Sequence, residues 1–137
     1  VPSSWKFTVI DGALGAPVHG ITTVLDSGSS NIDFLIVTTY QGISIFNGRY
    51  IVPELSWKIK AFWDSLTKND FRKIQILNES ISQRLFCVLP TGDLLMGDYK
   101  NGLNAKNIRW WPWSFQVPVT CIAVVNITDV IIGLDQT

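Results

Sequence analysis

The sequence predicts an all-β fold, a β-propeller or a segment of one, with blade repeats of about 52 residues. Three observations lead to this prediction. Tryptophans recur evenly, at Trp5, Trp57 and Trp110, with separations of 52 and 53 residues. The stretches between them hold short runs of β-branched and aromatic residues, which favour strands, and turn-forming residues bound these runs. About four strands per period near 50 residues is typical of propeller blades.

The surroundings of the three tryptophans also repeat. Ser4-Trp5-Lys6-Phe7 matches Ser56-Trp57-Lys58-Ile59, and Arg109-Trp110-Trp111 is a looser third copy. A second landmark keeps nearly the same period, because Gly42 follows Trp5 by 37 residues and Gly92 follows Trp57 by 35. We therefore predict a structural repeat at Trp5, Trp57, Trp110, Gly42 and Gly92, and we expect Trp57 to be a large buried aromatic side chain.

The first repeat predicts strands at 18–25, 33–39 and 43–46, separated by turns at 26–31 and 40–42. The second repeat predicts strands at 73–77, 84–89 and 94–96, and the third predicts strands at 119–125 and 130–134. Their apolar runs are continuous, which is typical of strands covered on both faces. Segment 55–66 fits either a strand or a helix, and we predict a strand with a long loop.

We expect a single domain over 1–137, with blade-like repeats at 5–56 and 57–109 and an incomplete one at 110–137. A closed propeller typically needs at least four blades, whereas this length holds fewer than three periods. The chain is therefore expected to be a piece of a longer propeller or, less favoured, one of several copies that complete a ring. A two-sheet sandwich is the main alternative fold, but it would not explain the even tryptophan spacing.

Composition excludes several classes of protein. Apolar residues make up 47% and charged residues 16%, which argues against a disordered chain. The formal net charge is zero, so there is no basic footprint for sequence-specific nucleic-acid binding or for anionic lipid. No apolar stretch approaches the roughly 18 residues of a membrane span. A neutral chain does little to keep copies apart, which suits a subunit of an assembly.

Cys87 and Cys121 each lie inside an apolar run. We expect two reduced thiols in the core, because free cysteine is among the most buried residue types. A disulfide between neighbouring strands is the alternative. Their spacing matches no cysteine–histidine metal motif, and we predict neither a metal nor another cofactor.

Catalytic signatures are absent from the sequence, and we predict no enzyme. The single histidine, His19, has no second histidine or cysteine near it. Glycoside hydrolysis would need two carboxylates about 5 to 9.5 Å apart. The aspartates beside predicted turns are expected to have structural roles; they are Asp11, Asp33, Asp93, Asp98, Asp129 and Asp135.

The aromatic cluster at 110–115 is the most unusual local feature. Strand alternation sends Trp111 and Trp113 to one face and Trp110 to the other. Trp110 is the core candidate, because it belongs to the repeated set. Trp111 and Trp113 are candidate interface residues, since tryptophan is enriched at binding surfaces. Packing between blades is the more favoured interpretation for both, and a role at an interface is the alternative.

The stretches 33–59 and 84–115 resemble propeller regions of bacteriophage tail and nozzle proteins. The likeness lies in a strand, a glycine turn, a Leu-rich strand, an aromatic segment and a Trp strand. It implies a virion structural protein that binds other protein subunits in a ring of identical copies. We therefore expect a structural scaffold or adaptor located in the virion, with a cytoplasmic location as the alternative. The alternative functions are a cellular propeller adaptor that binds proteins and a carbohydrate-active propeller.

Overall fold

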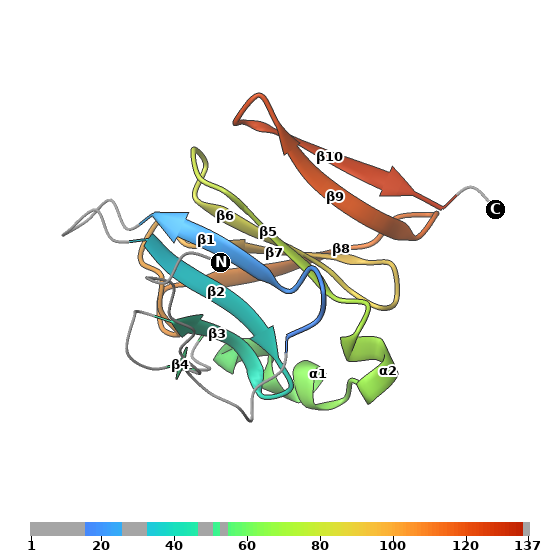
Figure 1. Cartoon of the computed structure of the whole chain (residues 1–137), viewed down its shortest axis with the longest axis horizontal. Coiled ribbons are helices and arrows are strands. Elements are labelled where there is room, and N and C mark those ends of the chain that lie inside the picture. Colours follow the sequence, from blue (N-terminus) through green and yellow to red (C-terminus); the bar gives the residue numbers. More distant parts are fainter. Residues whose placement is uncertain (1–15, 26–32, 47–50, 53–54, 136–137) are drawn as a thin grey trace, which may run out of the picture.

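The computed structural model describes residues 16–25, 33–46, 51–52 and 55–135 (Figure 1). Its strands form three antiparallel groups. The first sheet contains β1 (Ile21–Leu25), β2 (Asp33–Thr39), β3 (Gly42–Phe46) and β4 (Ile51–Val52). The second sheet contains β5 (Gln75–Glu79), β6 (Arg84–Val88), β7 (Leu94–Asp98) and β8 (Arg109–Trp113). The third group is a hairpin of β9 (Val119–Val125) and β10 (Asp129–Leu134). The prediction of an all-β fold class is confirmed.

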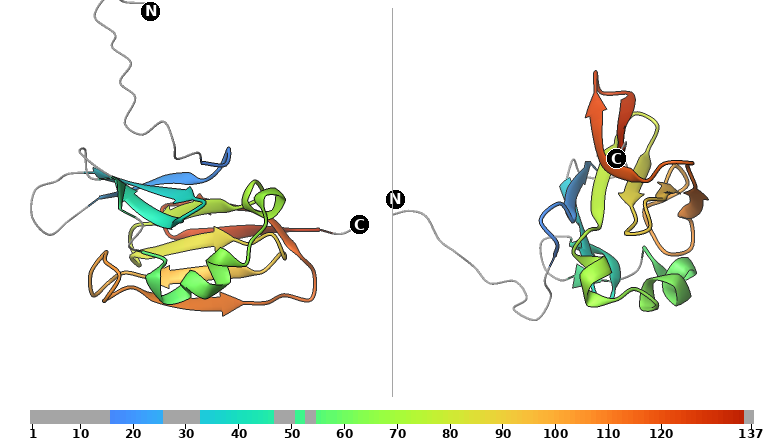
Figure 2. Two further views of the ribbon diagram at one scale, coloured as in Figure 1. Left: turned by 90° about the horizontal axis from the view of Figure 1, so that it is seen from below. Right: turned by 90° about the vertical axis from the view of Figure 1, so that its right-hand side faces the viewer.

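Within each group every strand pairs with the next one along the chain, so both four-stranded sheets have the same meander order. Strand β1 lies beside β5, and β5 lies beside β9. The three groups diverge from these first strands (Figure 2). In the right-hand view the hairpin points upward, the second sheet extends to the right and the first sheet lies to the lower left. The second sheet therefore has a neighbour on each face.

Hydrogen bonds join the first strands of successive groups. The amide of Ile76 donates to the carbonyl of His19 at 2.9 Å, and the amide of Asn78 donates to Oγ1 of Thr22 at 3.2 Å. On the other side, Nε2 of Gln75 donates to the carbonyl of Thr120 at 2.8 Å. These bonds fix the positions of the three groups relative to one another.

Two apolar clusters lie on opposite faces of the second sheet. Leu85 and Cys87 of β6 point into the cluster shared with the first sheet, which contains Val24 and Ile36. Phe86 and Val88, the alternate residues of β6, point into the cluster covered by the hairpin. Side chains alternate along a strand, so the continuous apolar run of β6 serves both interfaces. This is the burial on both faces that the sequence predicts for inner strands.

The segment between β4 and β5 is helical, so the predicted strand with a long loop at 55–66 is wrong. It contains η1 (Trp57–Ile59), α1 (Lys60–Asp64) and α2 (Lys68–Phe71). Trp63 is 2% exposed, packs edge-on against Phe71, and donates its indole N–H to the carbonyl of Thr39 at 2.9 Å. A helix places this one side chain in the core and leaves the polar neighbours of Trp63 in solvent.

A reciprocal cap begins α2. Oγ1 of Thr67 accepts from the amide of Asp70, while the Asp70 carboxylate accepts from the amide and the hydroxyl of Thr67. The Thr67 hydroxyl, bonded to the Asp70 carboxylate, lowers the pKa of that carboxyl group. Such a capping box satisfies amides that the first helical turn leaves without partners.

The expectation that Trp57 is buried is wrong, because its side chain is 68% exposed. Trp57 lies in η1, whereas Trp110 lies in β8, the last strand of the second sheet. Trp110 therefore does not open the third group, which begins at β9. Trp5 lies outside the described residues. Although Trp57 and Trp110 are evenly spaced in the sequence, they lie in different kinds of secondary structure.

The two landmark glycines occupy matching places. Gly42 and Gly92 lie at the hairpin turns between the second and third strands of their sheets. Both have positive φ, 149° at Gly42 and 87° at Gly92. A Cβ at Gly92 would also lie 2.4 Å from Cβ of Pro118, so the turn can contact the β8–β9 connection only with glycine there.

Candidate binding surfaces

Two of the aspartates that the sequence places beside turns accept hydrogen bonds within those turns. Oδ2 of Asp93 accepts from the Thr91 hydroxyl at 2.9 Å, and Oδ1 of Asp98 accepts from the amide of Lys100 at 2.9 Å. Asp129 is exposed at the start of β10. Asp11 and the side chain of Asp33 lie outside the description. Within the described ranges, no group of three histidine, cysteine or acidic residues is placed to hold a metal ion.

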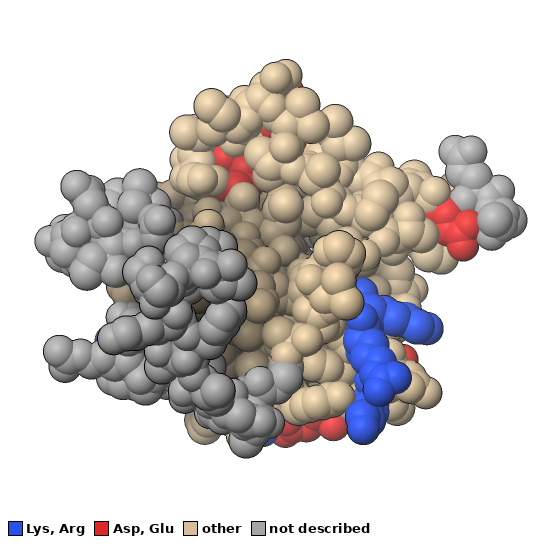
Figure 3. Space-filling model, in the orientation of Figure 1, with Lys and Arg blue, Asp and Glu red and all other residues tan. Residues whose placement is uncertain are grey.

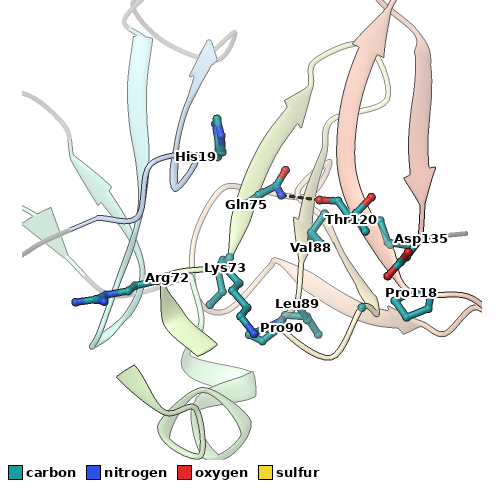
Figure 4. Close-up of a pocket in the computed structure, with 13 residues that line it drawn as sticks. His19, Arg72, Lys73, Gln75, Val88, Leu89, Pro90, Pro118, Thr120 and Asp135 are labelled. Atoms are coloured by element: carbon teal, nitrogen blue, oxygen red, sulfur yellow. Dashed lines mark hydrogen bonds between the residues drawn. The ribbon is translucent and has the colours of Figure 1, made fainter. Parts of the chain in front are cut away.

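A cavity of about 470 Å³ opens where β5 and β9 begin and β6 ends (Figure 4). Gln75 and Thr120 face each other across it and are joined by the hydrogen bond described above. Its apolar wall comes from the end of β6 with the turn after it, and from the β8–β9 connection with the start of β9; this wall includes Val88, Leu89, Pro90, Pro118 and Val119. The cavity therefore lies at the junction of the second sheet and the hairpin.

The charged residues around this cavity do not point toward one centre. Arg72 extends away from the other lining side chains, while Lys73 extends toward Pro90 (Figure 4). His19 lies at the rim on the side of β1, and Asp135 lies at the opposite side beside Pro118. Exposed basic side chains gather over α2 and the turn after it, where Figure 3 shows a blue cluster. These side chains give the cavity a polar rim.

Trp110 and its neighbours in β8 point to opposite faces, as strand alternation predicts. The indole of Trp110 donates to the carbonyl of Leu55 at 2.8 Å and packs against the cluster shared with the first sheet. A Cβ at Gly97, the residue paired with Trp110, would lie 2.6 Å from this indole. Glycine at position 97 thus makes room for the ring.

Trp111 and Trp113 lie on the other face and are 41% and 43% exposed. Trp113 and Phe115 line a cavity of about 310 Å³ between the second sheet and the hairpin. Val130 and Ile132 of β10 line the same cavity. The hairpin leaves these aromatic side chains partly in solvent, and their role at a protein interface stays a prediction.

The hairpin has a second apolar face that points away from the second sheet. Ala123 pairs with Ile131, and Cys121 pairs with Gly133. Ile131 is 53% exposed, and the side chains of Cys121, Ala123 and Val125 are exposed as well. The alternate residues Ile122, Val130 and Ile132 pack on the second sheet. We call the face formed by Cys121, Ala123, Val125 and Ile131 the hairpin outer face.

The first sheet also has an apolar face that points away from the second sheet. Ile21 pairs with Val37, and Thr23 pairs with Leu35, so these four side chains share one face. Ile21 is 54% exposed, Thr23 is exposed, and Leu35 and Val37 are half-buried. Val24 and Ile36 on the opposite face belong to the core. We call the face formed by Ile21, Thr23, Leu35 and Val37 the sheet outer face.

Both cysteines are free thiols, so the alternative of a disulfide between them is wrong. Cys87 is buried, as expected, and burial raises the pKa of its thiol to about 12. Cys121 is exposed on the hairpin outer face, so the expectation of a core thiol is wrong there. The apolar run of β9 suggested burial on both sides, but only one of its faces packs on a neighbouring sheet.

Comparisons with protein-family models, with curated proteins and with solved structures find no match to this chain. Among the described residues, no helix is long and apolar enough to cross a membrane. The sequence predicts neither outer face, although residues along β1 and β9 alternate between the two faces of their strands.

Proposed function

We propose that the chain is a structural scaffold in a multi-protein assembly, with its sheets serving as blades of a β-propeller-type ring. One observation carries the proposal. The first strands β1, β5 and β9 lie side by side, while the groups that they begin diverge from one another (Figure 2). Radial sheets with their first strands at the centre are the arrangement of propeller blades.

The two outer faces support a role in assembly. Such sheets bury their apolar faces against neighbours, and the two ends of this series have no neighbour within the described chain. Ile131 and Ile21 are 53% and 54% exposed at these ends. Burial of apolar surface stabilises an association by about 25 cal/mol per Å², before the costs of binding. A chain with zero net charge adds no long-range repulsion between subunits.

The chemistry of the remaining surface supports a scaffold over a catalyst. The described carboxylates of Asp93 and Asp98 are engaged in turns. In the cavity at the start of β5, Arg72 points away from the other lining residues. In a scaffold, strands fix the positions of loops, and the loops make specific contacts. The cavity and the exposed Trp111 and Trp113 are the surfaces that this scaffold would present.

We extend the proposal to a virion tail, on the resemblance of 33–59 and 84–115 to phage tail and nozzle propellers. Immunogold labelling with an antibody to the chain tests this location. We expect gold on the tails of phage particles from the source culture. Gold confined to the cytosol of the cells would favour the cellular adaptor instead.

Sedimentation velocity over a range of protein concentrations tests the scaffold function. We expect the full chain to associate and Ile131→Lys to shift it to monomers, because a charge on the hairpin outer face disfavours burial. The matched control is Ile81→Lys, since Ile81 is 64% exposed in the β5–β6 turn and belongs to neither outer face. A monomeric wild-type chain, or equal behaviour of the two variants, would overturn the proposal.

A further inference from the structure

The interfaces within the chain follow one rule. One face of the second sheet packs on the first sheet, and the opposite face packs on the hairpin. At each contact, the first strand of one group lies beside the first strand of the next. The contact between the first and second sheets is therefore repeated between the second sheet and the hairpin, with the first strands adjacent each time.

Among the described groups of strands, the hairpin outer face and the sheet outer face lie at the two ends of this series. The hairpin outer face corresponds to the face of the second sheet that packs on the hairpin. The sheet outer face corresponds to the face of the hairpin that packs on the second sheet. Each copy of the chain thus has one end of each kind.

We propose that two copies of this chain associate head to tail, with the hairpin outer face of one copy packed on the sheet outer face of the next. This inference rests on the proposed function and names the partner. Strand β9 of one copy then lies beside β1 of the other, which repeats the contacts of β1 with β5 and of β5 with β9. Because the two contacting surfaces differ, the association is heterologous and forms a ring when its rotation closes.

The chemistry of the two faces fits this pairing. The side chains that would meet are uncharged: Cys121, Ala123, Val125 and Ile131 on one copy, and Ile21, Thr23, Leu35 and Val37 on the next. Asp129 pairs with Val125 and shares the face of the hairpin at its end. At the other end, a Cβ at Gly133 would lie 2.4 Å from Sγ of Cys121. Glycine there leaves room for this thiol beside β10.

Both faces can carry a thiol, which makes the pairing testable in the full chain. Cys121 is exposed and Cys87 is buried, so the native protein has one accessible thiol among the residues described. Thr23→Cys adds a second thiol to the sheet outer face. A short bismaleimide then joins Thr23→Cys of one copy to Cys121 of the next.

We expect the Thr23→Cys variant to give covalent dimers and higher multiples on a denaturing gel, with a 23–121 linkage identified by peptide mass spectrometry. Adding Cys121→Ser should abolish these species. The matched control is Ser80→Cys, an exposed position in the β5–β6 turn outside both faces, which should not link to Cys121.

Two results would overturn the head-to-tail pairing. Linkage of Cys121 to Cys121 in the wild-type chain would show that hairpins meet across a two-fold axis. Absence of the 23–121 linkage, while Ile131→Lys still prevents association, would show that another partner surface contacts the hairpin. In that second case the proposed scaffold function stands and only the head-to-tail inference fails.

Discussion

Replacing Trp63 by Ala should destabilise the protein strongly, whereas replacing Trp57 by Ala should change its stability little. The two tryptophans are six positions apart in one helical segment, but Trp63 is 2% exposed and Trp57 is 68% exposed. The pair therefore separates a buried aromatic side chain from an exposed one. It also tests whether η1 and α1 replace the strand that the sequence predicts.

The magnitude follows from the contacts of each ring. Truncating a fully buried tryptophan costs about 3 to 5 kcal/mol, from lost transfer free energy and the cavity that remains. Trp63 also loses its hydrogen bond to the carbonyl of Thr39, which is 2.9 Å long. Substitutions at exposed positions usually stay within about 0.5 kcal/mol. Trp63→Phe keeps most of the apolar area and should cost about 1 to 2 kcal/mol, mainly through the lost hydrogen bond.

Urea denaturation followed by far-ultraviolet circular dichroism measures these differences without relying on tryptophan fluorescence. Folded domains are typically stable by about 5 to 15 kcal/mol, and Trp63→Ala removes a large part of this free energy of unfolding. Trp63→Phe is the milder variant that can be measured if Trp63→Ala does not fold. Equal losses of stability for Trp57→Ala and Trp63→Ala would show that Trp63 is not the buried member of the pair. A larger loss for Trp57→Ala would restore the predicted strand, with Trp57 in the core.

Three further predictions concern single residues. In the native protein Cys121 should react with Ellman's reagent while Cys87 does not, because Cys87 is buried and its thiol pKa is raised to about 12; urea should expose both thiols. Burial raises the pKa of Tyr99 from 10.0 to about 12, so the folded state favours the neutral phenol. Its contribution to stability is intact below pH 10 and is lost between pH 10 and 12. Urea midpoints should fall less over this range in Tyr99→Phe, which at neutral pH loses about 1 kcal/mol with its bond to Asn78. Gly92→Ala should cost about 1 to 3 kcal/mol by thermal denaturation, because φ is 87° and Cβ would meet Pro118; an unchanged melting temperature would contradict that contact.

The strands could be predicted well from local pattern. Predicted strands at 33–39 and 119–125 have the bounds of β2 and β9. The hairpin turns at Gly42 and Gly92 were also found, since positive φ favours glycine. These strands and turns depend on residues that are neighbours in the sequence, so local pattern is sufficient to predict them.

The helical segment and the state of Trp57 could not be predicted from the alternation of Trp57, Ile59 and Trp63, because this spacing fits a strand and a helix. One local signal favoured a helix, the capping pattern of Thr67 and Asp70. Burial of Trp63 depends on the carbonyl of Thr39 in a distant strand, which no local pattern reveals.

The candidate binding surfaces depend on the placement of whole sheets. Cys121 lies in an apolar run like that of Cys87, but β9 has a neighbouring sheet on one face and β6 has one on both. The cavity at the start of β5 likewise combines His19, Gln75 and Asp135 from three groups of strands. Residue alternation predicts which side chains share a face, and the fold decides which faces are covered.

Electron microscopy of the associated full chain tests the claim that the sheets form a ring, since it shows how they are arranged in the assembly. Class averages viewed along the first strands should show a closed ring of radiating sheets, with β1, β5 and β9 nearest the centre and no free outer face. Particles that are single copies, or pairs joined hairpin to hairpin without a ring, would contradict the claim.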